Sequence, residues 1–364
     1  MAYRIYFPLA FITGFVGILL WIHPPKNAIF YHRELMVTGF LLSAAFGFLL
    51  TAVPRFLTSL EIPKPLFMAL FISHLFAITG IFLSPVFYYT MLILTLVLFL
   101  LYLWDATKKR QGFIPFFMPY VFWGFSAATL SILLRLAGEF HYVSLTIAES
   151  ARVVYHHGLF LLLVLGIGQK LGVMLLGTAP NAKTVKYFMS LHWPHIYSFI
   201  FIMSYFFQNP QTAYITSTIR AVLVTWILIG GWNIFSKSQN PLAVSLWIRA
   251  LAITALLSVW TEAFFPVYMA HISHGVLAGI VGLFALMIMS RVLYGHEGLP
   301  NDLEKNVWYA HIIWGTLFLG LWTRSTAFLL KSYMIHLQMA SILWCFGLMA
   351  ITLSYFLGFR KAPP

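Results

Sequence analysis

The chain has 364 residues, of which 61% are hydrophobic and only 9% are charged. Soluble domains have about 45–50% apolar and about 25% charged residues. A mean hydropathy of +0.88 therefore excludes a water-soluble fold and a disordered chain. The formal charge of +13 does not indicate nucleic-acid binding, because the basic residues are scattered among apolar segments. The single cysteine, Cys345, excludes an internal disulfide and a cysteine-built iron–sulfur or structural zinc site.

Twelve apolar segments follow one another along the chain, separated by charge, proline and glycine. A helix needs about 20 apolar residues to cross a bilayer, and lipid offers no partner for an unpaired backbone amide. We therefore predict an all-α membrane protein with twelve transmembrane helices in a single transmembrane domain over residues 1–364. The predicted spans are 5–22, 35–53, 66–83, 86–104, 114–134, 153–175, 192–207, 215–235, 242–264, 269–293, 307–324 and 333–356.

Lysine and arginine are distributed unevenly between the two sides of these spans. Thirteen flank the spans on the side of the N-terminus, including the run Lys108-Lys109-Arg110, and six flank them on the other side, including Arg324 and Lys331. Cytoplasmic loops carry the excess of positive charge. We therefore expect a multi-pass protein of the bacterial inner membrane, surrounded by membrane lipids, with both termini in the cytoplasm.

Histidine is unusually frequent, with thirteen residues against nine carboxylates. Three clusters lie at the outer ends of the second, sixth and tenth predicted spans. They are His32, then His156 with His157, then His271 with His274. The separations are 125 residues from His32 to His157 and 117 residues from His157 to His274. This recurrence every four spans predicts three pseudo-symmetric arcs of four helices around one centre.

These histidines are candidate metal ligands. Neutral imidazole binds iron, copper and zinc, and ionisable groups inside a membrane are costly and usually functional. A haem here would be non-covalent and b-type, because the chain has no Cys-x-x-Cys-His attachment motif. The spacing alone does not separate haem from copper. The candidate metal ligands are His32, His156, His157, His271 and His274.

Charged residues beside the histidines favour a cofactor site. Arg152 lies four residues before His156, and Arg33 is adjacent to His32. Arginine pairs bidentately with carboxylates, so either residue could hold a haem propionate. Glu262, near the outer end of the ninth span, is a candidate to relay protons or to orient a ligating imidazole. The alternative is that these side chains are interfacial and bond to backbone carbonyl groups or lipid headgroups.

Three stretches of the chain resemble the NnrS family, whose members are polytopic haem- and copper-containing membrane proteins of the nitric oxide response. The first is 32–54, which ends in Gly-Phe-Leu-Leu-Thr-Ala-Val-Pro, and the second is 274–298, which ends in Gly-His-Glu-Gly. The stretch 157–172 is a looser match. Glu34 stands where the family pattern carries its second histidine, and Gln169-Lys170 stands near an arginine that is usual in the sixth span.

The resemblance carries over to His32 and His274, which are the predicted ligands of haem b. His157 is the main alternative ligand. Arg152 is the predicted cofactor-binding residue beside it. Copper or a second haem at His156, His157 and His271 is a further prediction. The helix order is also similar to the catalytic subunit of haem-copper oxidases and nitric oxide reductases. That subunit has further ligands on its seventh helix.

The expected function is haem and copper binding in nitric oxide metabolism, protection from nitric oxide stress or membrane redox chemistry. The expected ligand is a small diatomic molecule such as nitric oxide. The protein would then be a redox enzyme that acts on this molecule. Its expected partners are a redox protein or further subunits of a complex. The alternative is a non-catalytic protein: an assembly factor, a metal-delivery factor or a structural subunit of a respiratory complex.

Overall fold

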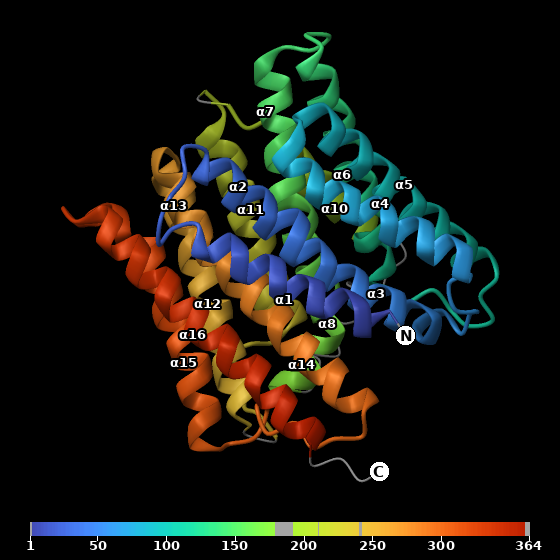
Figure 1. Cartoon of the computed structure of the whole chain (residues 1–364), viewed down its shortest axis with the longest axis vertical. Coiled ribbons are helices and arrows are strands. Elements are labelled where there is room, and N and C mark those ends of the chain that lie inside the picture. Colours follow the sequence, from blue (N-terminus) through green and yellow to red (C-terminus); the bar gives the residue numbers. More distant parts are fainter. Residues whose placement is uncertain (1, 179–191, 210, 240–241, 361–364) are drawn as a thin grey trace. The chain divides into compact units, whose positions relative to one another are not determined.

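Helices make up almost all regular structure in the computed structural model, which describes residues 2–178, 192–209, 211–239 and 242–360 (Figure 1). These residues contain no β-strand, as predicted. Lys183, Lys186 and Lys361, which contributed to the predicted orientation, lie outside the described residues. Ten helical segments are long and apolar enough to cross a membrane: Ala28–Leu57, Lys64–Leu83, Pro85–Lys108, Met118–Glu139, Leu145–Leu176, Ala213–Gly231, Ala243–Phe264, Pro266–His296, Trp308–Leu329 and Tyr333–Phe356.

The other two predicted spans correspond to shorter helices, α1 (Tyr3–Leu19) and α10 (Trp193–Phe206), of 17 and 14 residues. All twelve predicted segments thus fall on helices, and the chain is a multi-pass membrane protein. Ten of the described helices meet the length needed for a full crossing. The number twelve stays a prediction.

The break between α4 (Lys64–Leu83) and α5 (Pro85–Lys108) shows how local sequence sets these boundaries. Ser84 has an extended backbone (φ −162°, ψ 136°), and its hydroxyl accepts a hydrogen bond from the amide of Phe87 at 3.5 Å. Pro85 then occupies the first helical position, where its missing N–H costs nothing. The prediction that Ser84-Pro85 separates two spans is confirmed.

Three of the helical segments differ from the rest in length, burial and hydrogen bonding. They are 28–57, 145–176 and 266–296, with 30, 32 and 31 residues. In their apolar windows 67–83% of residues are buried, against at most 56% in the other seven segments. These three segments are therefore more deeply buried along their length than the other seven. Their parts are α2 (Ala28–Glu34), η1 (Leu35–Leu41) and α3 (Leu42–Leu57); α7 (Leu145–Val153), η2 (Val154–Gly158) and α8 (Leu159–Leu176); and η4 (Pro266–Tyr268), α13 (Met269–His274), η5 (Gly275–Leu283) and α14 (Phe284–His296).

Each of these three segments contains a π-helical turn beside its histidines. The π-helical stretches η1, η2 and η5 begin at Leu35, Val154 and Gly275, at intervals of 119 and 121 residues. A fourth, η3 (Ile227–Gly231), ends the helix that begins as α11 (Ala213–Trp226) and has no adjacent histidine. π-Helical turns are rare and are frequent at functional sites. The order of elements thus repeats every four helices.

The chain divides into two units that interleave in sequence. Unit 1 comprises Met1–Phe48, Gly172–Ala179 and Ile234–Pro364; unit 2 comprises Leu49–Leu171 and Pro180–Asn233. Unit 1 holds α1, α2, η1, α12 (Ala243–Phe264), α13, η5, α14, α15 (Trp308–Thr326) and α16 (Tyr333–Arg360). Unit 2 holds α4, α5, α6 (Met118–Glu139), α7, α10 and α11. The single domain over 1–364 stays a prediction.

Within unit 1, α1 and α16 run in opposite directions. Gln338, near the start of α16, donates to the carbonyl of Ile22 beyond the end of α1 at 3.3 Å. The rings of Phe11 and Tyr355 are 5.7 Å apart. The start of α1 and the end of α16 therefore lie at the same end of unit 1. The placement of both termini in the cytoplasm stays a prediction.

Candidate functional site

His32 lies in α2, and a hydrogen bond defines which of its ring nitrogens carries the proton. Its Nδ1 donates a hydrogen bond to the backbone carbonyl of Gly17 at 2.9 Å, and the indole ring of Trp21 meets its ring edge-on at 5.4 Å. A bond from Nδ1–H to a carbonyl leaves Nε2 with its lone pair, which is the arrangement that metal-ligating histidines commonly have. His32 is therefore held as a metal ligand would be.

The two histidines of α13 lie at the same end of unit 1 as His32. His274 Nδ1 donates to the carbonyl of Ala270 at 3.1 Å. His271 stacks on Phe328 with ring centres 5.0 Å apart and meets the edge of Tyr333 at 5.7 Å. The carbonyl bonds that the interfacial interpretation predicts are thus present for His32 and His274. For His32 this bond uses Nδ1 only.

Arg324, near the end of α15, joins His32 and His271 into one cluster. Its charge acts on both imidazoles. α13 packs against α15, and Phe328, just beyond α15, stacks on His271. We name Trp21, His32, His271 and Arg324 the His–Arg cluster. It lies at the end of unit 1 opposite the start of α1, because Trp21 follows α1 directly. The placement of these histidines on the outer face of the membrane stays a prediction.

Several polar atoms of the His–Arg cluster are buried without a hydrogen-bond partner among the described residues. They are Trp21 Nε1, His271 Nδ1, Arg324 Nε and Arg324 Nη1. Indole and guanidinium nitrogens are hydrogen-bond donors only. Buried polar atoms are normally paired, so an unpaired set calls for an explanation. The donor character of this set suits an anionic ligand.

His156 and His157 lie in η2, within unit 2. His156 is buried, with 3% of its surface exposed, and its ring lies 5.2 Å from that of Tyr155. His157 is half-buried and lies 6.1 Å from the ring of Tyr205 on α10. Adjacent helical residues point about 100° apart, and these two histidines indeed meet different aromatic neighbours.

The two arginines predicted to hold a propionate already have carboxylate partners. Arg152 Nε donates to Glu149 at 2.6 Å, and Glu149 also accepts from Arg135 at 2.7 Å. In unit 1, Arg33 Nε donates to Glu34 at 2.9 Å. Glu34 is only 2% exposed, so this bond compensates a buried charge. Position 34, where the family pattern has a histidine, is thus the partner of Arg33.

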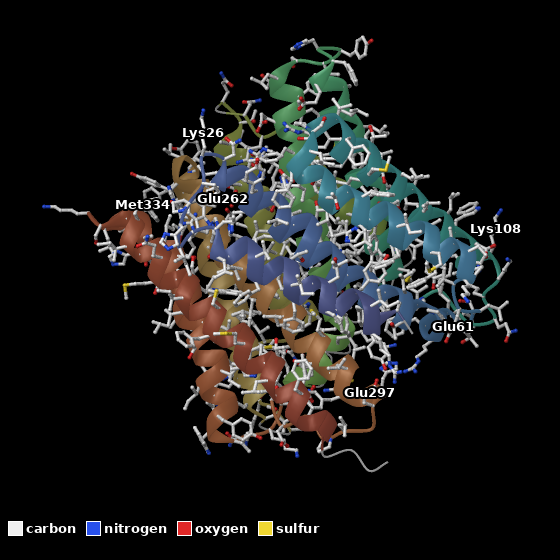
Figure 2. All side chains as sticks on the ribbon, viewed as in Figure 1. Lys26, Glu61, Lys108, Glu262, Glu297 and Met334 are labelled. Atoms are coloured by element: carbon white, nitrogen blue, oxygen red, sulfur yellow. The ribbon has the colours of Figure 1, made fainter. Side chains whose placement is uncertain are left out.

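The carboxylates of unit 1 lie at two different ends. Figure 2 shows Glu262 at the end where Met334 and Lys26 also lie, and Glu297 at the other end. Glu262 is buried near the end of α12, on the same side as the His–Arg cluster. It keeps its predicted position near the histidines.

Glu297 forms a clasp between α1 and α14. It accepts hydrogen bonds from the hydroxyl of Tyr3 at 2.7 Å and from Arg4 at 3.0 Å, and the ring of His296 lies 4.9 Å from that of Tyr3. The motif Gly-His-Glu-Gly at 295–298 therefore closes one end of unit 1, while His274 lies at the opposite end. The beginning and the end of the stretch 274–298 therefore lie at opposite ends of unit 1.

No group of three or more His, Cys, Asp or Glu side chains comes together as a metal site among the described residues. His32, His156, His157, His271 and His274 therefore stay candidate ligands. Sequence reasoning missed Arg324, which it counted with the loop charges flanking the spans. No sequence signal marked it, because the contact of this region with α13, through Phe328 and His271, is tertiary.

A protein-family model described as NnrS protein matches residues 1–361, which is nearly the whole chain. A comparison with curated proteins found no match.

Proposed function

On the premise that this chain belongs to the NnrS family, we propose that it is a haem-binding membrane protein of the nitric oxide response, with copper as a second candidate metal. The observation that carries the proposal is the repeat of three long, buried helices with histidines at a π-helical turn. π-Helical turns are frequent at functional sites, and ionisable side chains within membrane segments are usually functional.

The residues of unit 1 fit a haem. His32 and His274 each have Nδ1 bound to a backbone carbonyl, which fixes the orientation of the ring, and His157 is the alternative ligand. Aromatic rings of Trp21 and Phe328 pack beside His32 and His271. Bound haem iron with an open axial position would bind nitric oxide or oxygen, and iron with two imidazole ligands would transfer electrons.

The proposal includes the arrangement predicted from the repeat. Three arcs of four helices would each contribute one histidine-bearing helix to a common centre. Both termini would face the cytoplasm of a bacterium, and the His–Arg cluster would face the periplasm, in line with the excess of positive charge on the side of the termini. His156, His157 and His271 are the candidate copper ligands, or ligands of a second haem.

Absorption spectroscopy and metal analysis of the purified protein test cofactor binding. We expect a Soret band and iron in the wild type, and a shifted or lost band in His32→Ala and His274→Ala. His336→Ala is the matched control, because His336 Nδ1 also bonds to a backbone carbonyl, that of Ser332 at 2.9 Å, but His336 is outside the proposed ligand set. A protein without Soret band and iron would refute the proposal.

Anaerobic addition of nitric oxide to the reduced protein separates the function classes. A spectral shift with gas consumption identifies a redox enzyme, and a shift without consumption identifies a binding or sensing protein. An unchanged spectrum of a six-coordinate haem would leave electron transfer or a structural role in a respiratory complex. The wild type and His274→Ala are compared at equal haem content.

A further inference from the structure

The guanidinium group of Arg324 is only partly paired. Two of its guanidinium nitrogens, Nε and Nη1, are buried and have no hydrogen-bond partner among the described residues. Arginine keeps its charge in proteins, and an uncompensated charge removed from water is strongly unfavourable. An arginine near the end of an apolar helix is expected to reach water or to meet an anion. These two nitrogens do neither.

The other arginines of unit 1 are engaged, which singles out Arg324. Among arginines of this unit whose side chains are described, each of the other four donates a hydrogen bond; these are Arg4 to Glu297, Arg33 to Glu34, Arg249 to the carbonyl of Ser236, and Arg291 to Glu304. Three of the four have a carboxylate as partner. Arg324 therefore lacks the partner that this unit supplies to the other three.

The surroundings of Arg324 select an anion with hydrogen-bond acceptors. The unpaired Nε1 of Trp21 adds a neutral donor to the cluster, and the ring of Trp21 touches His32. His32 and His271 both feel the positive charge of Arg324. An anion bound there would compensate this charge and satisfy donors that otherwise stay unpaired.

We propose that Arg324, with the indole N–H of Trp21, binds a propionate carboxylate of the haem. This inference rests on the proposed function. His32 would ligate the iron of a haem through Nε2, and the same haem carries two carboxylates. One ligand would therefore supply both a metal for His32 and an anion for Arg324. Guanidinium–carboxylate pairs are bidentate and strong, and an ammonium group replaces them poorly.

Titration of the apo-protein with haem b and with its dimethyl ester tests the proposal, because the ester has no carboxylate charge. We expect the wild type to bind haem about 10- to 100-fold more tightly than the ester, which corresponds to one or two charge-assisted hydrogen bonds. Arg324→Gln and Arg324→Met should lose this preference by weakening haem binding alone. Arg324→Lys should retain part of it.

Lys331→Gln is the matched control, since it removes one positive charge at an exposed position only seven residues away. It should leave the preference unchanged. Thermal unfolding of the apo-protein gives a second readout: Arg324→Met should be at least as stable as the wild type, because it removes a buried unpaired charge. A structural role for Arg324 predicts the opposite, a loss of apo-protein stability.

Equal affinity of the wild type for haem and ester would overturn the propionate site while leaving haem binding intact; this comparison needs no variant. The propionate site is also overturned if Arg324→Gln keeps the full preference, as it would if a lipid headgroup were the partner of Arg324. A wild type that binds neither porphyrin would overturn the proposed function and this inference together.

Discussion

Replacing Gly275 by alanine should destabilise the protein, because η5 packs tightly against α12 at this glycine. Gly275 has ordinary helical dihedrals (φ −59°, ψ −30°), so the backbone tolerates a side chain. Space is the constraint: an added Cβ would overlap the hydroxyl oxygen of Ser258 and lie 3.1 Å from the Cβ of Ser258. Because Gly275 directly follows His274, this contact also sets the position of a proposed ligand.

The expected magnitude combines two opposing effects. Overpacking costs about 1–3 kcal/mol, and here about 2 kcal/mol, since the serine hydroxyl can rotate away but its Cβ cannot. Alanine in place of glycine within a helix contributes about 1 kcal/mol of stability. Gly275→Ala should therefore lower the free energy of unfolding by about 1 kcal/mol. In a Ser258→Ala background the same change should be neutral or stabilising, because most of the overlap is gone.

Equilibrium unfolding in mixed micelles measures the four members of this double-mutant cycle. Gly295→Ala is the matched control: it lies in the same helical segment, an added Cβ there meets nothing within 4 Å, and the change should stabilise slightly. An equal effect of Gly275→Ala with and without the Ser258 hydroxyl would refute the expected overlap. Such additivity would mean that η5 and α12 do not pack through these residues.

Three other groups of side chains yield predictions that can be measured directly. Copper content measured in His156→Ala/His157→Ala protein should fall if these residues bind copper, and undiminished copper would remove them from the ligand set. Glu149→Gln should lower the free energy of unfolding by about 1–2 kcal/mol, a value reduced for partial solvent exposure, because two guanidinium groups lose one carboxylate; unchanged denaturation midpoints would contradict it. The hydroxyl of Tyr3, together with Arg4, holds the pKa of Glu297 below its usual value of 4.5, so its contribution to stability is present above this pH and is lost as pH falls through the lowered pKa. The free energy of unfolding, measured from pH 6 to pH 3, should therefore fall with pH in the wild type, and this contribution should be absent in Glu297→Gln.

Local composition was sufficient to predict the helices. Each apolar segment needs only its own residues to satisfy its backbone hydrogen bonds, so span positions and the Ser84-Pro85 break follow from neighbours in sequence. The spacing of the histidine clusters is equally local information. It predicted the four-helix period that the π-helical turns at 35, 154 and 275 repeat.

The partners of charged side chains could not be predicted in this way. Arg152 and Arg33 looked alike in sequence, as arginines beside histidines, and both turn out to bond to nearby carboxylates. Arg324 looked like a loop charge, but it is half-buried, two of its guanidinium nitrogens are buried, and its charge acts on His32 and His271. Whether a guanidinium has a free edge depends on which helices surround it.

The sequence by itself determined that this protein is an all-helical membrane protein of the NnrS family, and it located the three histidine clusters at 32, 156–157 and 271–274. Only the tertiary structure decided that Gly17 anchors the His32 ring, that Tyr3 reaches Glu297 across 294 positions of the chain, and that the His–Arg cluster forms. The physical reason is range. Hydrophobic transfer and helical hydrogen bonds act within a segment, whereas pairing of buried polar groups joins residues that packing alone brings together.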